Sequence, residues 1–184
     1  MVQTDQPNDW GRKNSRSESF NDSFVFYYNP HQFLSLRFYR LHLKRGSEVQ
    51  LVAYLNTTLV ALAVETLGNK ALGQGVLDFF MADFLAMRMP VVESPNLEHV
   101  FKELNKRSVL SVWDEFGLPK PNKDYSNIRP EDISLEKVLP DRRSLDQVVF
   151  EALGLTEAEQ LEIYRAVVWL VKQRLSKAHS LDDK

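Results

Sequence analysis

The sequence contains no cysteine. Neither a disulfide framework nor a thiolate metal site can therefore form, and a reducing compartment is permitted. The four histidines are scattered along the chain without the spacing of metal ligands. No nuclease-like series of acidic residues and lysine follows Asp141, and no glycine-rich loop after a strand offers a cofactor site. We therefore expect no metal and no cofactor on this chain.

The sequence also lacks a long uninterrupted hydrophobic run. Its longest apolar stretch, 51–67, contains too many polar side chains for a segment that faces lipid. They are Asn56, Thr57, Thr58, Glu65 and Thr66. The N-terminus shows no charged-then-apolar signal pattern before a cleavage site. These features predict a cytoplasmic protein with no membrane segment.

A strong excess of either charge is missing as well. The net charge is −2, with nine Lys and Arg against eight Asp and Glu in 1–92, and fourteen against seventeen in 93–184. A pI near 6.1 is not typical of an isolated DNA-binding domain. The 184 residues, 43% hydrophobic and 26% charged, suit a globular protein with a core of its own. We therefore expect one domain with appendages.

What is present is organised around 47–92. A capping box of Ser47 and Gln50 opens a long helix that ends at Gly68. A loop with Gly73-Gln74-Gly75 comes next, followed by a predicted strand over 76–81, a helical turn over 82–86 and an edge strand over 87–92. The apolar positions of the long helix recur with the helical period: Leu51, Val52, Leu55, Leu59, Leu62, Ala63 and Leu67.

The flanking segments complete the predicted fold. Upstream, 1–23 is polar and predicted to be disordered, whereas 24–28 and 33–43 are rich in aromatic and branched residues and predict two strands. Downstream, the sequence predicts a helix over 97–116, a proline-punctuated surface loop over 118–144, and helices over 145–153 and 157–178, the last opened by a capping box of Thr156 and Glu159. The predicted class is α+β, with short strands around one long helix, followed by C-terminal helices.

Three motifs in the central region occur in the order of a known family. They are Leu55-Asn56-Thr57-Thr58-Leu59, Gly73-Gln74-Gly75 and Phe84-Leu85-Ala86-Met87-Arg88-Met89-Pro90-Val91. The series resembles the target recognition domain at the C-terminal end of N6-adenine DNA methyltransferases of prokaryotic restriction-modification systems. The specificity subunits of type I systems are related to this domain.

A second match lies downstream. It begins with Leu145-Asp146-Gln147-Val148-Val149-Phe150-Glu151-Ala152-Leu153-Gly154-Leu155-Thr156 and continues through Tyr164, Val171, Arg174-Leu175 and Lys177-Ala178-His179-Ser180. This stretch is similar to the C-terminal tail of many such methyltransferases. The two matches together span 33–180. The local patterns and the resemblance together divide the chain into a disordered lead-in (1–23), a target-recognition-like α+β core (24–92), a helix and surface loop (93–144) and a C-terminal helical tail (145–184).

The resemblance implies that this chain is the sequence-recognition portion of the enzyme and lacks its catalytic part. The family holds a flipped adenine with an Asn-Pro-Pro-Tyr or Asn-Pro-Pro-Phe motif. Here Asn29-Pro30-His31-Gln32 lacks both the second proline and the aromatic residue, so it is interpreted as a turn. No catalytic residue carries over to this chain. The implied partners are double-stranded DNA and a catalytic methyltransferase subunit, or a missing N-terminal domain, which would bind S-adenosylmethionine.

The DNA-binding residues follow from this reading. Gln74 is the predicted base reader, because a glutamine amide can bond the N6 and N7 edge of adenine and flanking glycines permit close approach to a groove wall. Asn69 and Lys70 precede it in the same loop. A phosphate-contacting rim is predicted beside the loop, formed by Arg37, Arg40, Lys44 and Arg45.

Each of these residues also has a purely structural explanation. The rim can be a strand edge with ordinary surface cations, and the glycine loop can be a turn with positive φ. Asn69 and Lys70 can be a helix C-cap and a cation favoured by the helix dipole.

The terminal helix supports a different class of function. Its apolar stripe, which Ile163, Trp169 and Leu170 widen, can be buried in the domain or can dock on another subunit. The stripe consists of Leu161, Tyr164, Val167, Val168, Val171 and Leu175. The alternative hypothesis is therefore a helical interaction module that binds another restriction-modification subunit without contacting DNA.

Overall fold

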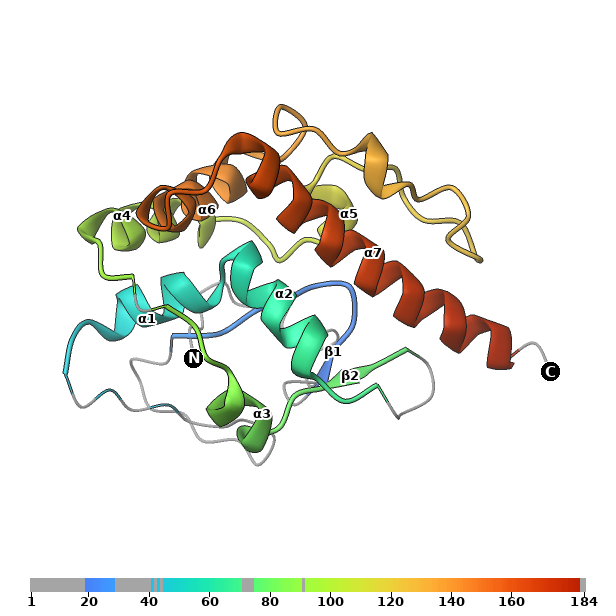
Figure 1. The fold of residues 1–184 in the computed structure, drawn as a ribbon, viewed down its shortest axis with the longest axis horizontal. Coiled ribbons are helices and arrows are strands. Elements are labelled where there is room, and N and C mark those ends of the chain that lie inside the picture. The colour runs from blue at the N-terminus through green and yellow to red at the C-terminus, as the bar shows by residue number, and fades with distance from the viewer. Residues whose placement is uncertain are drawn as a thin grey trace.

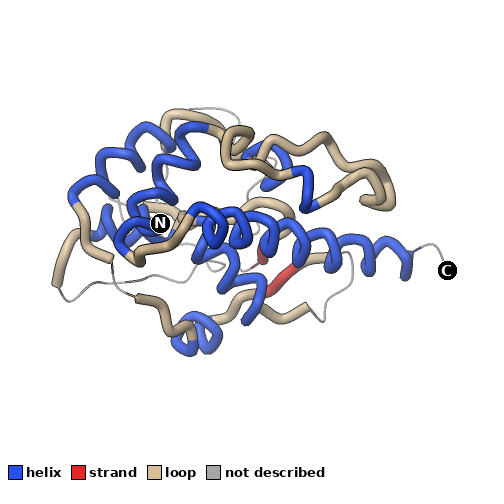
Figure 2. The backbone as a smooth tube through the Cα atoms, turned by 45° about the horizontal axis from the view of Figure 1, so that its top comes forward, coloured by secondary structure: helices blue, strands red, loops and turns tan. Residues whose placement is uncertain are grey.

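The computed structural model describes residues 19–28, 41, 43, 45–70, 75–90 and 92–182. Helices prevail within these residues, and strand is confined to one short pair of segments (Figure 2). The predicted α+β class therefore holds only in a limited sense, because the fold is mostly helical with little sheet. The strands are β1 (Ser19–Phe20) and β2 (Leu77–Asp78), and the helices are α1 (Glu48–Leu55), α2 (Thr58–Leu67), α3 (Met81–Ala86), α4 (Pro95–Leu104), α5 (Val112–Glu115), the 3-10 helix η1 (Pro130–Asp132), α6 (Pro140–Ala152) and α7 (Glu157–Asp182).

The predicted long central helix is two helices. Ser47 opens α1 as expected, because its hydroxyl accepts a hydrogen bond from the Gln50 N–H at 3.3 Å. The helix then breaks after Leu55, and α2 continues at an angle of 66° to α1. Gly68 caps α2 as predicted, but in an extended conformation rather than a left-handed one. No single helix in the described ranges has the length and apolarity to cross a bilayer; α1 and α2 together meet both criteria, but they are bent.

The break changes which side chains of the second half are buried. In α1, Val52 and Leu55 lie in the core as the apolar stripe predicts. In α2 the fully buried aliphatic residues are Val60 and Val64, whereas Leu59 is only partly buried and Leu67 is 40% exposed. The bend therefore shifts the buried face of α2 by one position relative to a continuous helix.

The sheet is smaller than the sequence predicts. β2 falls within the predicted strand 76–81 and pairs antiparallel with β1, which aligns Phe20 with Leu77. β1 lies inside the segment predicted to be disordered, so that prediction is wrong for residues 19–23. The predicted strands 24–28 and 87–92 are wrong in their described parts, where only an isolated bridge at Tyr28 occurs. The predicted strand 33–43 lies outside the described residues except Leu41 and Leu43, and neither is in a strand.

The C-terminal half follows the predicted order of elements with different limits. The helix predicted over 97–116 is interrupted, because Ser111 caps a separate short α5. The predicted loop 118–144 contains η1 and the first turn of α6, where Pro140 occupies an N-terminal position. The capping box of α7 is confirmed: the Thr156 N–H and hydroxyl both donate to the Glu159 carboxylate, at 2.8 and 2.7 Å.

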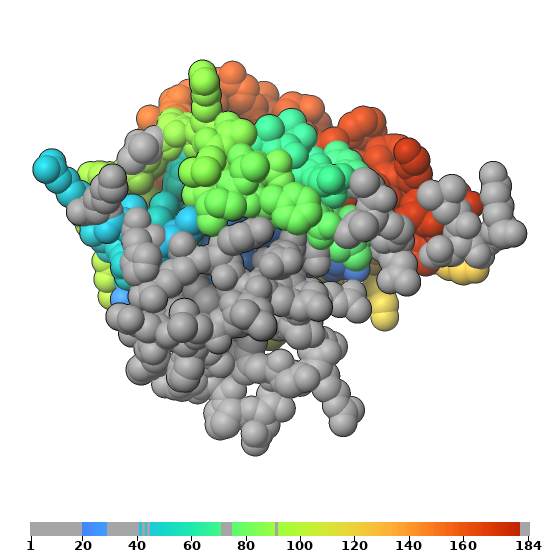
Figure 3. Space-filling view, turned by 90° about the horizontal axis from the view of Figure 1, so that it is seen from below, coloured from blue at the N-terminus to red at the C-terminus, as the bar shows by residue number. Residues whose placement is uncertain are grey.

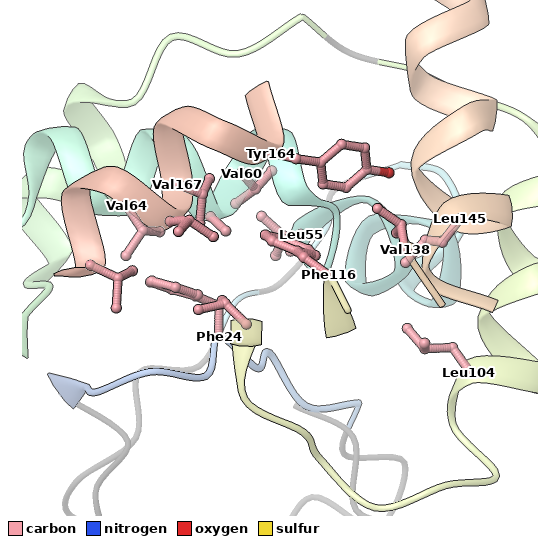
Figure 4. Close-up of a cluster of buried hydrophobic side chains, with 14 of the residues drawn as sticks. Phe24, Leu55, Val60, Val64, Leu104, Phe116, Val138, Leu145, Tyr164 and Val167 are labelled. Carbon is pink, nitrogen blue, oxygen red and sulfur yellow. The ribbon is translucent and has the colours of Figure 1, made fainter. Parts of the chain in front are cut away.

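One core joins these elements. Figure 1 shows α7 crossing the molecule above α2, with α4 and α6 near the beginning of α7 and with β1, β2 and α3 below α2. In the close-up of Figure 4, Leu55 and Val60 lie near Tyr164 and Val167, while Val138, Leu145 and Leu104 extend the cluster. The tail region thus contributes α7 and the larger part of α6 to the same core as the central helices.

Candidate nucleic-acid interface

The first motif of the resemblance forms the break between α1 and α2. The Asn56 amide donates to the carbonyls of Phe26 and Val52, both at 2.8 Å, and its oxygen accepts from the Phe26 N–H at 3.1 Å. The Thr57 hydroxyl donates to the Tyr54 carbonyl at 2.8 Å. Asn56 and Thr57 are both buried. Their polar groups therefore stabilise the bend and do not face a nucleic acid.

The tail match meets the first motif at Thr58. The Thr58 N–H and hydroxyl donate to the Asp146 carboxylate at 2.7 and 2.6 Å, and the Tyr164 hydroxyl donates to the same group at 2.9 Å. All three residues are buried. Burial raises the pKa of Asp146, although Arg142 and these donors oppose the change. Burial and the nearby Asp146 also raise the pKa of Tyr164. A carboxylate so enclosed and hydrogen-bonded holds helices together and offers no access to a substrate.

A buried arginine reinforces the same junction. Arg142 donates to the Glu115 carboxylate at 2.6 and 3.1 Å and also to the Asn56 carbonyl. Glu115 accepts a further bond from Arg107 at 3.0 Å, and Arg107 reaches Asp141. Desolvation of the Arg142 guanidinium opposes its charge, but Glu115 and Asp146 outweigh that effect and raise its pKa. The network links α1, α5 and α6 through two arginines that are paired with two carboxylates.

The Gly73-Gln74-Gly75 motif is described only at Gly75, since 71–74, and with them Gln74, lie outside the described residues. Gly75 has a φ of +67°, which a side chain disfavours. A Cβ at this position would stand 2.7 Å from Leu175 Cδ2 and 3.2 Å from the Ala178 Cβ. The close approach that this glycine permits is therefore to α7. The expectation that it brings the backbone to a DNA groove does not account for its conformation.

A second buried arginine fixes Gly75. Arg174, on α7, donates to the Gly75 carbonyl, to the Asn21 carbonyl at 2.5 Å and to the Glu65 carboxylate at 2.5 and 3.1 Å. Arg174 is 6% exposed and Glu65 is fully buried. Sequence reasoning missed this pair, although a signal exists: Glu65 and Arg174 are opposite charges that fall on the buried faces of α2 and α7.

The other predicted DNA-binding residues do not form one cluster. Arg37, Arg40 and Lys44 lie outside the described residues. Arg45 precedes α1 and Lys70 follows α2, and both are exposed. Because α1 and α2 hold eight and ten residues and bend by 66°, their outer ends lie on the order of 20 Å apart, at about 1.5 Å per residue. Arg45 and Lys70 thus lie at opposite ends of the helix pair.

Asn69 is exposed and its backbone pairs with Asp78 at 2.8 and 3.0 Å. The alternative explanation of Asn69 as a helix C-cap is wrong, since Gly68 caps α2 and Asn69 begins the bridge to β2. This backbone pairing fixes the start of the loop, while Arg174 fixes its end at Gly75. Both fixed points are close to the predicted base reader in sequence.

The third motif of the resemblance lies at the surface. It comprises the end of α3 and the segment 87–90, with Val91 outside the described residues, and α3 contains no buried residue. Leu85 is 76% exposed and Phe80, just before α3, is 40% exposed. Figure 3 shows the green α3 segment on the outer face of the molecule. The acidic residue of this turn, Asp83, accepts the Phe80 N–H at 2.8 Å and so caps its own helix.

No group of three or more His, Asp or Glu side chains in the described part of the chain is arranged to hold a metal ion. Comparison of the chain with protein-family models, with curated proteins and with solved structures gave no match. The functional interpretation therefore rests on the sequence motifs and on the geometry described above.

Proposed function

We propose that this chain is the DNA sequence-recognition portion of a restriction-modification adenine-specific DNA methyltransferase. The catalytic part, which would bind S-adenosylmethionine and the flipped adenine, would be a separate subunit or an N-terminal domain. In this proposal the chain does not catalyse methyl transfer by itself. A cytoplasmic location would follow from a function on chromosomal or invading DNA.

The observation that carries the proposal is that the two stretches resembling the family meet in space through specific bonds. Thr58 of the first motif bonds Asp146 of the tail, 88 positions away. Gly75 of the second motif bonds Arg174 of the tail, 99 positions away. The contacts therefore support treating both matches as parts of one unit.

The exposed cations are compatible with this role. Arg45 and Lys70 flank the helix pair, and a spacing on the order of 20 Å is shorter than one turn of B-DNA, at roughly 34 Å. Phosphate contacts of this kind would position the duplex, while Gln74 would read a base edge. The small negative net charge of the whole chain implies that such contacts are local.

The experiment uses the chain together with its catalytic portion and measures binding to the preferred duplex and to an unrelated duplex. Gln74→Ala should cost about 1–3 kcal/mol on the preferred site and little on unrelated DNA. Equal losses on both duplexes would remove Gln74 from base reading. No loss on either would make the loop an ordinary turn.

The second candidate function is an interaction module that docks on another restriction-modification subunit without contacting DNA. The predominance of helix and the 53% exposure of Trp169 on α7 favour it. Most of the α7 stripe is buried within the chain, which leaves Trp169 as the main apolar group for such docking. Two results together would favour this candidate. The chain would form a stable complex with the other subunit in the absence of DNA, which Trp169→Ala disrupts, and it would show no salt-dependent binding to DNA.

A further inference from the structure

Residues 19–28, which we call the arm, contain β1 and no helix, and they are drawn in blue in Figure 1. The arm is held by a set of residues that lie far from it in the sequence, which we call the arm site. They are Asn56, Leu77, Val112, Trp113 and Arg174. The arm site therefore combines the break between α1 and α2 with β2, α5 and α7.

β2 and α7 hold the beginning of the arm. β1 pairs antiparallel with β2, which places Phe20 opposite Leu77. The Asn21 carbonyl accepts a hydrogen bond from the Arg174 guanidinium at 2.5 Å, and the buried Glu65 carboxylate keeps that guanidinium in place. Because Asn21 is itself exposed, α7 binds this residue through its main chain.

α5 and the break between α1 and α2 hold the rest of the arm. The Asp22 carbonyl accepts from the Val112 N–H at 2.8 Å, and the Asp22 carboxylate accepts from the Trp113 Nε1–H at 3.3 Å. The Phe26 N–H donates to the Asn56 side-chain oxygen at 3.1 Å, and the Phe26 carbonyl accepts from the same amide group at 2.8 Å. Most of the bonds to the arm thus go to its main chain.

Phenylalanine side chains anchor the arm in the core. Phe24 is 8% exposed, and its ring stacks on Phe20 with 5.4 Å between the ring centroids. The Phe20 ring in turn meets Phe79, which follows β2, edge to face at 6.4 Å. Main-chain hydrogen bonds combined with buried apolar side chains are the means by which proteins bind extended segments of other chains.

The contacts between the arm and the arm site are the same whether both belong to one copy of the chain or to two. Each hydrogen bond between them joins residues at least 30 positions apart. The sequence from the arm to Arg45 has 16 residues (29–44), which a fully extended chain can stretch to roughly 50 Å. A second copy carries an identical arm and an identical site, and exchange of an identical element between protomers is a low-cost route to a dimer.

We propose that the arm exchanges between copies of this chain, so that residues 19–28 of one copy occupy the arm site of a second copy. This inference goes beyond the proposed function and does not rest on it. The arm of the same copy competes for the site at an effective concentration of about 1 mM. The exchanged dimer should therefore form as the chain approaches that concentration, and each of its two arm sites holds the arm of the other copy.

The first test traps the exchanged arm with a disulfide. The chain contains no cysteine, so a single-cysteine variant carries one thiol. Ser19 and Asp78 are opposite in the register of β1 and β2. Opposite residues of antiparallel strands have Cα atoms about 4.5–5.5 Å apart, which a disulfide can span.

Ser19→Cys and Asp78→Cys chains are mixed in equal amounts at about 1 mM, left to exchange and then oxidised. Mixed disulfide dimers should be on the order of tenfold more abundant than in a control mixture of Ser19→Cys and Glu151→Cys. Position 151 is exposed on α6, so its thiol reacts only on collision. Equal yields from the two mixtures would overturn the proposal.

A matched pair of arm substitutions, each added to the Ser19→Cys chain, tests whether the disulfide depends on docking. Phe24→Ala removes the buried anchor and should lower the yield of mixed dimer by on the order of tenfold. Asn21→Ala keeps the carbonyl that Arg174 binds and should leave the yield unchanged. Circular dichroism first confirms that both chains are folded. Equal yields from the two chains would contradict docking of the arm.

The parent chain provides an independent measurement that needs no substitution. Isotope-labelled and unlabelled chains are mixed in equal amounts at about 1 mM, where exchange is expected. Nuclear Overhauser effects between the labelled and the unlabelled copies should then join Phe20 of one copy to Phe79 of the other, because these rings are in contact. Cross-peaks confined to pairs within one copy would overturn the proposal, even if a cysteine variant failed to fold.

Discussion

The Asp146 carboxylate accepts both the N–H and the hydroxyl of Thr58, at 2.7 and 2.6 Å, and so fixes the first residue of α2 to α6. The Tyr164 hydroxyl, on α7, donates a hydrogen bond to the same carboxylate. These bonds explain why a run of apolar residues that could form one helix forms two. They also make the Thr58–Asp146 pair the natural place to test what holds the fold together.

Removal of the Asp146 carboxylate should therefore destabilise the whole domain. Asp146→Ala leaves three buried donors without their acceptor, which should lower the free energy of unfolding by about 3 kcal/mol. Urea unfolding followed by circular dichroism measures this change. Glu151→Ala, an exposed position on the same helix, serves as the control and should change stability by less than about 0.5 kcal/mol. Similar losses for the two variants would contradict a structural role for Asp146.

The two aspartates of α6 should respond to pH with opposite signs. Partial burial opposes ionisation of Asp141, but hydrogen bonds from Arg107 and the Arg142 N–H outweigh it and lower its pKa from 3.8. Its contribution to stability is therefore present above pH 3.8 and lost as the pH falls below that value. For Asp146 the pKa is raised, so its contribution is largest below pH 3.8 and declines as the pH rises through the folded-state pKa.

Unfolding measured between pH 3 and pH 7 should separate the two groups, with the pH range chosen as roughly that in which carboxylates titrate. Asp141→Asn should flatten the loss of stability at the acid end, whereas Asp146→Asn should remove the opposing decline towards neutral pH. Identical pH profiles for the two variants would show that their environments do not differ as described.

The bend in the central helices changes the expected effect of core substitutions. On the sequence alone, Leu59→Asp is predicted to unfold the domain, but Leu59 is only partly buried and Val60 is fully buried. Val60→Asp should therefore unfold the chain, because an unpaired carboxylate in the core has no partner. Leu59→Asp should remain folded with reduced stability. Thermal unfolding of both variants measures the difference. If Leu59→Asp is the more destabilised variant, Leu59 and not Val60 lies on the buried face of α2.

The predicted phosphate rim should contribute to DNA affinity regardless of the base sequence of the duplex. Replacement of Lys44 and Arg45 by Ala should weaken binding to every duplex to a similar extent. The logarithm of the binding constant falls linearly with the logarithm of the salt concentration, and the magnitude of this slope should decrease by roughly one unit for each phosphate that the variant no longer neutralises. Fluorescence anisotropy over a range of salt concentrations measures both effects. A weakening confined to the preferred duplex would indicate base recognition. An unchanged slope would mean that Lys44 and Arg45 do not contact phosphates.

The purified chain should show no methyl transfer to DNA and no saturable binding of S-adenosylmethionine. The physical reason is that the proposed division of labour places the cofactor pocket and the adenine pocket in the catalytic portion. Isothermal titration calorimetry with the cofactor provides the direct measurement. A tight one-to-one complex with this chain would overturn that division.

Much of the local structure could be predicted from short-range signals. Ser47 with Gln50, and Thr156 with Glu159, identify helix starts because the capping bonds form between residues three positions apart. The glycine at position 75 could be recognised as conformationally special, since glycine tolerates positive φ. The basic residues and Gln74 could be proposed for DNA contact only through the resemblance, and most of them lie outside the described residues.

The sequence by itself determined where α1 and α7 begin and that the chain has an apolar core. Only the tertiary structure decided that the central helix breaks between Leu55 and Thr58 and that Gly75 packs on α7. The physical reason is distance along the chain: Asp146 and Arg174 act from 88 and 99 positions away. No local periodicity or capping pattern contains such bonds, because they exist only once the helices have packed.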